Sequence, residues 1–269
     1  MSMAPKSESA TLPAVAIVGI STELPSGQAL PENLGHSAFF QFLLDKCQSY
    51  ETIPLERFDI DTWYGKKNGN VVTKKGSFLK SIALFDPLEF GISSRDVATM
   101  AVSTRKLIEH SFLALLDSGI HYRGQNVGCF ISDICESILT VIQANEELAG
   151  SLAGYPYSAA NKVSYHLDLR GPTIPTTTAC SSTASALYLA VQALRARDCE
   201  AAVVGGCQLN YNVEDWIQYS DGKVLSPDGE CKPFDASADG FSRGEGVAVL
   251  VVKLLNQAIS DGDHIYASV

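Results

Sequence analysis

The segment TTTACSSTASAL at residues 176–187 constrains the fold of this 269-residue chain most strongly, because a strand-like run ends in it and a helical run begins. Residues 171–178 favour a strand, whereas apolar residues recur every three or four positions from residue 180 to 197, as an amphipathic helix requires. The turn between them places the thiol of Cys180 at or near the start of that helix. Unpaired N–H groups and the positive end of the helix dipole favour an anion there. A cysteine at such a position is expected to form its thiolate more readily. Because the thiolate is the attacking form of cysteine, we expect Cys180 to be a nucleophile.

The chain contains seven cysteines, so the position of a single thiol carries little weight by itself. A buried cysteine ahead of a small-residue helix, packed closely against a strand, explains the segment without any chemistry. The odd number of cysteines and the lack of CxxC spacing favour reduced thiols over disulfides or a zinc site. What favours a nucleophile at Cys180 is its setting, a turn rich in small and hydroxyl-bearing residues between a strand and a helix.

The remaining hydrophobic pattern alternates strand-like and helix-like runs along most of the chain. Strands are predicted at residues 14–20, 127–132, 171–178, 200–206 and 246–255, and helices at 33–47, 94–118, 137–148, 157–167 and 180–197. Asn33 is expected to cap the first helix and Gly119 to close the long one. Strands separated by helices predict an α/β fold, with a mostly parallel five-stranded sheet covered by helices on both faces. Residues 1–13 are predicted to be a disordered tail and residues 14–269 to be one domain.

Composition and charge narrow the class of function. Thirty acidic and twenty basic residues give a net charge of −10, which disfavours nucleic acid or an anionic membrane surface as a partner. The longest uninterrupted apolar runs, such as residues 247–252, have the length of strands, so no membrane span is predicted. The apolar run at residues 14–20 is too short for a secretion signal. We therefore expect a cytoplasmic chain.

Two other sequence patterns, a GxSxG match and the histidine spacing, do not support a hydrolase or a metal site. Residues 240–244, GFSRG, match the GxSxG pattern of hydrolase nucleophile elbows, which requires a strand before the serine and a helix after it. Here a polar loop precedes Ser242 and a strand-like run follows, so a glycine-rich backbone turn is the better interpretation. The five histidines show neither HxxxH nor HExxH spacing, and no metal site is predicted.

Several segments, taken in order along the chain, resemble the β-ketoacyl synthases, condensing enzymes of fatty acid and polyketide synthesis that have the thiolase fold. TACSS at the predicted nucleophile turn is similar to the active-site motif of that family. The other similar segments are ERFD with WYG within residues 56–65, KGSFL at 75–79, FDPLEFGIS at 85–93, NKVSY at 161–165, VGG at 204–206, LSPDG at 225–229 and DGFSRGEG at 239–246. ERFD with WYG resembles the polyketide synthase branch, so we expect a polyketide-type ketosynthase.

The resemblance implies a reaction and partners. In the family, the cysteine that matches Cys180 takes an acyl group from a carrier-protein thioester, and a malonyl unit then loses carbon dioxide and attacks it. This implies an acyltransferase that works with an acyl carrier protein and its phosphopantetheine arm, and that needs no cofactor of its own. The Cys180 N–H would form part of an oxyanion hole. A homodimer is expected, because family dimers pair the strand before the nucleophile with its twin.

Four further residues are predicted to shape the substrate site. The resemblance to the family implies that Gly240 and Phe241 form part of the wall of the substrate pocket. The glycine pair Gly205 and Gly206, at the end of a predicted strand, lets a backbone or a ligand approach closely.

The chain also departs from the family pattern. The family usually carries Asp-Pro-Gln ahead of the residue matching Arg105, where this chain has AVST at residues 101–104, and an aspartate where this chain has Thr177. Family members have two pseudo-symmetric halves, and both catalytic histidines lie in the second. The 269 residues of this chain are therefore expected to be the N-terminal half, which carries the nucleophile, with the C-terminal half absent. A second hypothesis is a non-catalytic or decayed thiolase-fold subunit that pairs with another chain. Thr177 and the missing half favour it, whereas the intact TACSS turn favours the enzyme.

Overall fold

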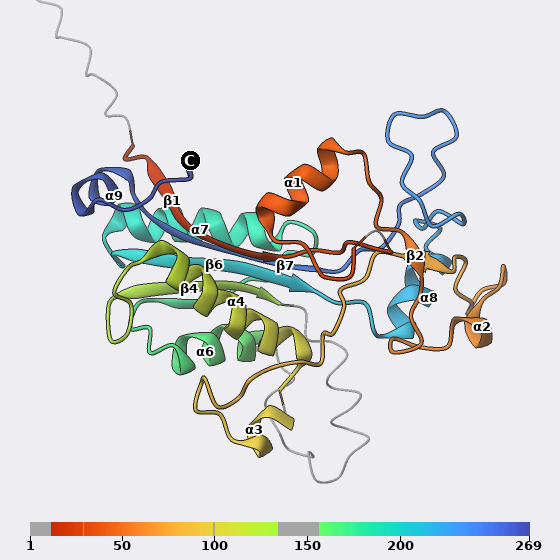
Figure 1. Cartoon of the computed structure of the whole chain (residues 1–269), viewed down its shortest axis with the longest axis horizontal. Helices are drawn as coiled ribbons and strands as arrows, with labels where there is room; N and C mark the ends of the chain where they lie inside the picture. The colour runs from red at the N-terminus through yellow and green to blue at the C-terminus, as the bar shows by residue number, and fades with distance from the viewer. Residues whose placement is uncertain (1–11, 29, 99, 134–155) are drawn as a thin grey trace, which may run out of the picture.

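The computed structural model describes residues 12–28, 30–98, 100–133 and 156–269. Within them, a six-stranded sheet with the strand order β5-β4-β6-β7-β1-β8 forms the centre of the molecule (Figure 1). Its strands are β1 (Val15–Glu23), β4 (Val127–Asp133), β5 (Thr173–Pro175), β6 (Ala201–Gln208), β7 (Gly246–Leu254) and β8 (Ala267–Ser268). A smaller sheet pairs β2 (Glu51–Thr52) with β3 (Lys75–Gly76).

Most strands of the large sheet point the same way. β4 pairs in parallel with β5 and with β6. β7 is antiparallel to both β6 and β1, and β8 is antiparallel to β1. It follows that β1, β4, β5 and β6 share one direction, and that β7 and β8 run against them. The predicted α/β fold with a mostly parallel sheet is confirmed. The two-residue β8, too short to show a period in the sequence, extends the five predicted strands to six.

Helices cover both faces of the large sheet, as predicted. α4 (Val102–Ser118) and α6 (Pro156–His166) lie on one face, and α7 (Ser182–Ala196) lies on the other (Figure 1). α1 (His36–Leu44) and α9 (Leu255–Asp261) contact β1. α2 (Ile60–Trp63) and α8 (Val213–Asp221) pack with the segment around β2 in a satellite apolar cluster, and α3 (Ser94–Ala98) precedes α4.

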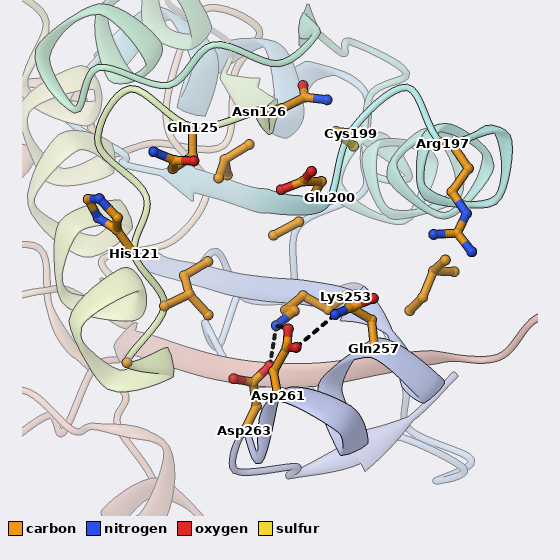
Figure 2. Close-up of a pocket in the computed structure, with 15 residues that line it drawn as sticks. His121, Gln125, Asn126, Arg197, Cys199, Glu200, Lys253, Gln257, Asp261 and Asp263 are labelled. Carbon is orange, nitrogen blue, oxygen red and sulfur yellow. Dashed lines mark hydrogen bonds and ion pairs between the residues drawn. The ribbon is translucent and has the colours of Figure 1, made fainter.

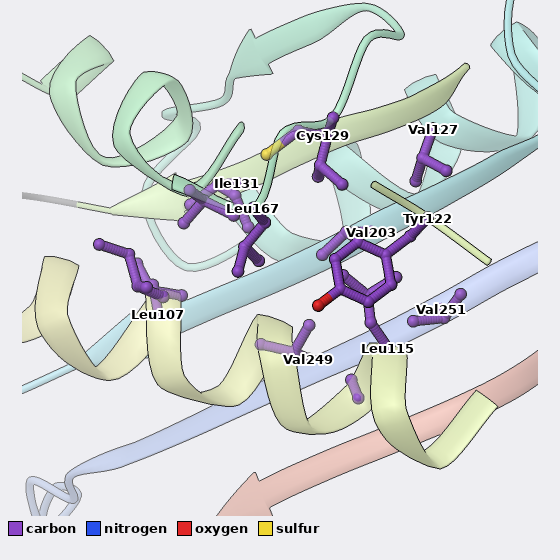
Figure 3. Packing of buried hydrophobic residues seen from close by; sticks show 14 of the residues in the cluster. Leu107, Leu115, Tyr122, Val127, Cys129, Ile131, Leu167, Val203, Val249 and Val251 are labelled. Atoms are coloured by element: carbon purple, nitrogen blue, oxygen red, sulfur yellow. The ribbon is translucent and has the colours of Figure 1, made fainter. Parts of the chain in front are cut away.

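Alternate residues of the central strands fill two apolar clusters, one on each face of the sheet. On β6, Val203 belongs to the cluster beneath α4 and α6, while Ala202 and Val204 belong to the cluster under α7. Figure 3 shows the first cluster, in which Leu107 and Leu115 of α4 point at the strands. Strands that are apolar on both faces are typical of a sheet covered on both sides. Each fully buried aliphatic side chain stabilises the fold by about 1.5–3 kcal/mol.

The helix predicted at residues 94–118 is two helices, α3 and α4. The backbone leaves helical geometry at Ala101, whose φ and ψ are −55° and 147°. α4 ends as predicted at Gly119, which has a φ of +68° and donates its N–H to the carbonyl of Leu116. A glycine adopts this left-handed conformation without the steric cost that a side chain imposes.

The prediction that Asn33 caps the first helix is wrong. α1 begins after Gly35, and the Asn33 amide instead donates to Glu23 Oε1 at 2.6 Å and to the carbonyl of Lys80 at 3.0 Å. Both partners are distant from the helix start, and no local pattern of residues reveals them. The short α8 and α9 were also not predicted from the sequence.

The predicted helix at 137–148 and residues 1–11 of the predicted tail lie outside the described residues. Across the part of the chain that is described, no helix combines the length and the hydropathy needed to cross a membrane.

Candidate active site

Cys180 lines a cavity of about 320 Å³ at the ends of β4 and β6, beside the start of α7. The cavity is lined by Leu24, Ser132, Ala179, Cys180, Ser182, Thr183, Gly206, Cys207, Gln208, Gly246, Val247 and Ala248. The carboxyl ends of parallel strands are the usual position of ligand sites in α/β sheets. The predicted nucleophile therefore lies where such a sheet offers its binding crevice.

The turn before α7 holds the thiol clear of the core. Cys180 is exposed, Ser181 occupies the N-cap position of α7, and the helix begins at Ser182. The preceding residue, Ala179, has a φ of +54°, in the left-handed region that residues with side chains rarely adopt. The predicted order of strand, turn and helix is confirmed, but the strand is limited to Thr173–Pro175 and the helix begins at Ser182, so the thiol lies one residue before the cap.

Serine and threonine hydroxyls surround this turn. Ser182 Oγ accepts a hydrogen bond from the Thr178 N–H at 2.8 Å and donates one to the Ala179 carbonyl at 2.6 Å. Ser181 Oγ donates to the Thr178 carbonyl at 2.8 Å, and Thr178 Oγ1 lies 3.0 Å from Ser185 Oγ. Backbone N–H and C=O groups outside helices and strands need other hydrogen-bond partners, and in this turn nearby serine hydroxyls provide them.

The two glycines of β6 differ in position. A Cβ atom on Gly206 would lie 2.5 Å from Thr183 Oγ1, so the absence of a side chain lets the first turn of α7 approach the strand. A Cβ atom on Gly205 would instead meet Val249 Cγ2 at 2.8 Å, on the opposite face of the sheet. Gly206 shares the cavity with Cys180, whereas Gly205 is not among its lining residues.

Gly240 and Phe241 lie in the loop that leads to β7, and they are not among the residues that line the Cys180 cavity. Gly240 has a φ of +147°, and a Cβ atom there would lie 2.4 Å from the backbone of Leu225. The Phe241 ring is 40% exposed and meets the ring of Tyr219 edge to face at 5.9 Å. Their role in substrate binding stays a prediction. Ser242 precedes β7 with no helix directly after it, which agrees with the interpretation of GFSRG as a turn.

A buried carboxylate, Glu245, joins four segments next to the cavity. Its side chain forms a two-contact ion pair with Arg57, and it accepts hydrogen bonds from the backbone N–H groups of Leu79 and Asn210, each at 2.9 Å. The next residue, Gly246, lines the Cys180 cavity. Three of these segments, around Arg57, Leu79 and Glu245, resemble the family in sequence, but no local pattern predicts that they meet.

A second buried polar cluster, also missed from the sequence, ties the end of β1 to α4. Glu23 Oε2 lies 3.0 Å from Lys106 Nζ and 3.1 Å from His110 Nε2, and His110 Nδ1 lies 2.8 Å from Ser21 Oγ. Burial opposes ionisation of Glu23, but the hydrogen bond of His110 and the positive charge of Lys106 outweigh it, so its pKa falls to about 2. Glu23 is therefore a carboxylate at neutral pH.

Another cavity, of about 540 Å³, lies at the opposite end of the large sheet, by the starts of β4 and β6 (Figure 2). In it, Lys253 Nζ forms ion pairs with Asp261, at 2.6 Å, and with Asp263. Burial disfavours the charged lysine, while the two carboxylates favour it more strongly, and its pKa is raised. The thiol that lines this cavity, Cys199, is a poor nucleophile, because burial raises its pKa to about 11. Among the residues described, no group of three or more His, Cys, Asp or Glu is placed to hold a metal ion.

The mostly parallel sheet between helical layers is a thiolase-like α/β fold, as the likeness to solved ketosynthases shows. The ketosynthase from module 6 of the bacillaene synthase of Bacillus subtilis 168 shares it, with a TM-score of 0.83 and 31% identity. The oxazolomycin ketosynthase domain of Streptomyces albus JA3453 does so with a TM-score of 0.84 and 29% identity. The chain belongs to the β-ketoacyl synthase family, because residues 13–258 match the family model described as beta-ketoacyl synthase, N-terminal domain.

Curated relatives point to the polyketide synthase branch. The chain is 54% identical over 256 residues to a highly reducing polyketide synthase of Strobilurus tenacellus. It is 35% identical over 280 residues to a highly reducing polyketide synthase of Aspergillus sclerotiorum. These matches cover 95% and 99% of the chain but only 9% and 11% of the two synthases. The two solved ketosynthases are also matched over 95% of the chain, and over 42% and 45% of their own lengths.

Proposed function

We propose that this chain is the nucleophile-bearing part of a polyketide ketosynthase, in which Cys180 carries the growing acyl group. The observation that supports this most directly is the exposed Cys180 thiol at the start of α7, beside a cavity of about 320 Å³. A cavity of this size is at the lower end of those that bind small molecules, and it suits the acyl end of a tethered substrate.

The first step is acyl transfer from a carrier-protein thioester. The Cys180 thiolate attacks the thioester carbonyl, the C–S bond to the phosphopantetheine arm breaks, and the arm leaves as a thiol after taking up a proton. The Cys180 N–H is a candidate donor to the oxyanion that forms at the carbonyl. Such donors act at the charge that develops in the transition state, and one of them typically contributes about 10²–10³ in rate.

The second step is decarboxylation of a malonyl thioester and attack of the resulting enolate on the Cys180 acyl group. Carbon dioxide leaves, the new carbon–carbon bond forms, and the Cys180 thiolate is released. The enolate oxygen needs hydrogen-bond donors that are in place in advance of the reaction. None of the residues described as lining the cavity is a histidine. We therefore propose that groups outside these 269 residues supply the donors.

The outer face of α7 supports a partner layer on that side. Tyr188 is 63% exposed on a helix whose other face covers the sheet. On α1, Phe40 and Leu43 are 64% and 53% exposed. We take these large exposed apolar side chains as support for a surface that another unit covers. We propose that a second ketosynthase half occupies it, and that an acyl carrier protein delivers substrates to the assembled site.

The test is an assay with acyl and malonyl carrier proteins, followed by mass spectrometry of the chain. We expect a covalent acyl group on Cys180, absent in Cys180→Ala and retained in the matched control Cys47→Ala. The 269 residues alone should yield the acyl-enzyme without the β-ketoacyl product. If these residues alone formed the product at about 1 s⁻¹, the proposal that the enolate donors come from outside them would be wrong. An unmodified Cys180 would favour the second hypothesis, a non-catalytic thiolase-fold subunit.

A further inference from the structure

The backbone at Ala179, directly before the nucleophile, adopts an unfavourable conformation that its surroundings must hold in place. Its φ of +54° lies in the left-handed region, where the Cβ atom of an alanine crowds the following carbonyl. Such conformations persist only where neighbouring contacts determine them. The direction in which Cys180 presents its thiol depends on this turn, because the two residues are adjacent.

One side chain bonds to the backbone on both sides of the strained residue. Ser182 Oγ accepts from the Thr178 N–H at 2.8 Å and donates to the Ala179 carbonyl at 2.6 Å. A serine hydroxyl has one proton to donate, so these two bonds fix its orientation as well as that of the turn. Ser182 is 3% exposed, so water has little access to compete for these bonds.

The neighbouring serine provides a natural comparison. Ser181 Oγ also bonds to Thr178, at its carbonyl and at Oγ1, and the residue is exposed. Water can replace the bonds of an exposed hydroxyl, whereas the buried Ser182 side chain leaves little room for water once its hydroxyl is removed. The two serines therefore differ in what their removal does to the turn.

We propose that Ser182 is a positioning residue for the nucleophile. Its hydroxyl holds Ala179 in the left-handed conformation and so fixes the direction in which Cys180 presents its thiol to the cavity. Ser182 also lines the Cys180 cavity, so the same side chain joins the turn to the cavity wall.

The test compares Cys180 with Cys47, an exposed thiol elsewhere in the chain, during a short pulse of iodoacetamide resolved by peptide mapping. In Ser182→Ala, we expect the Cys180 to Cys47 labelling ratio to fall about fivefold, the scale of one lost hydrogen bond. Ser181→Ala should stay within about twofold of wild type. Glycine adopts a positive φ freely, so adding Ala179→Gly to Ser182→Ala should restore most of the ratio.

Two outcomes would overturn the proposal. One is an unchanged labelling ratio in Ser182→Ala. The other is a double variant, Ala179→Gly with Ser182→Ala, that is folded by circular dichroism yet labels as slowly as Ser182→Ala. Acylation of Cys180 by an acyl thioester is measured in parallel and rests on the proposed function. If wild type is never acylated, the proposed function fails, while the alkylation ratio still decides the role of Ser182.

Discussion

Arg57 and Glu245 lie 188 positions apart in the sequence and meet as a buried ion pair, with 2.8 Å from Arg57 Nε to Glu245 Oε1 and 2.7 Å from Nη2 to Oε2. Their side chains are 5% and 0% exposed. The Glu245 oxygens also accept the N–H groups of Leu79 and Asn210, so all four hydrogen bonds are charge-assisted. This pair holds the loop that leads to Gly246 and the cavity.

Breaking this ion pair should destabilise the fold severely. Arg57→Met leaves a buried carboxylate without its cation, and we expect a loss of about 3–5 kcal/mol in the free energy of unfolding. Chemical denaturation monitored by circular dichroism measures it. The control is Lys74→Met, which removes an exposed ion pair with Asp61 and should leave the denaturation midpoint unchanged. Equal losses in the two variants would contradict the role assigned to the buried pair.

The carboxylate of Glu23 should make stability fall in acid. Its pKa is about 2 in the folded chain and 4.5 as the ordinary value, so the folded state releases this proton more readily than the unfolded state. The stabilisation is fully present above pH 4.5 and is lost as the pH falls through 2. Linkage gives at most about 3 kcal/mol at neutral pH, because solvent still reaches part of the side chain.

The variant Glu23→Gln tests this stabilisation. Its free energy of unfolding should be well below that of wild type at pH 7, and the difference should shrink steadily between pH 4.5 and 2.5. The exposed Glu56 offers the control Glu56→Gln, which should follow the wild-type curve. A gap between wild type and Glu23→Gln that stays constant over this pH range would rule out the assignment.

Iodoacetamide should label Cys180 first among the cysteines of the native chain. Burial raises the pKa of Cys129 to about 12 and that of Cys199 to about 11, so both should resist labelling near neutral pH. Cys47 and Cys231 are exposed but do not lie near the start of a helix, and they should react at intermediate rates. Peptide mapping after a short pulse gives the order. Uniform labelling, or faster labelling of Cys47 or Cys231, would count against an activated nucleophile.

The outer edge of β5 should carry a homodimer contact. β5 lies at one end of the strand order in the described part of the sheet, with β4 as its neighbour, and its Ile174 is 37% exposed. A two-fold axis beside this edge would place each Ile174 near its twin in a closed contact. Light scattering should find a dimer at micromolar concentration for wild type and a monomer for Ile174→Lys. Ile259→Lys, on the exposed face of α9, is the matched control and should stay dimeric. A wild-type monomer at that concentration would contradict the prediction.

The nucleophile turn could be predicted from the sequence because its strand, turn and helix are contiguous. The period of the apolar residues and the small residues around Cys180 carry the information locally. The glycine pair shows the limit of such patterns. Only the register of β6 decides that Gly206 faces α7 and Gly205 the opposite cluster, and the sequence names both without separating them.

The two buried polar clusters could not be predicted, for a different reason. Charged residues such as Glu23, Lys106 and Arg57 are usually exposed, so a sequence pattern assigns them to the surface. Their burial depends on partners brought together by the sheet, across 188 positions in the case of Arg57 and Glu245. The same cause explains the wrong prediction for Asn33, whose amide bonds to Glu23 and Lys80 instead of capping α1.

The position of β7 between β6 and β1 governs when this domain can fold during synthesis. Val15 at the start of β1 pairs with Leu254 at the end of β7. A ribosome that adds about 5–20 residues per second makes the second partner roughly 10–50 s after the first. The other neighbour of β1 in the sheet, the two-residue β8, is made later still. During that time α4, made at residues 102–118, is available to cover β1, which still lacks both of its neighbours in the sheet. We therefore expect synonymous changes that slow translation before residue 246 to lower the soluble yield.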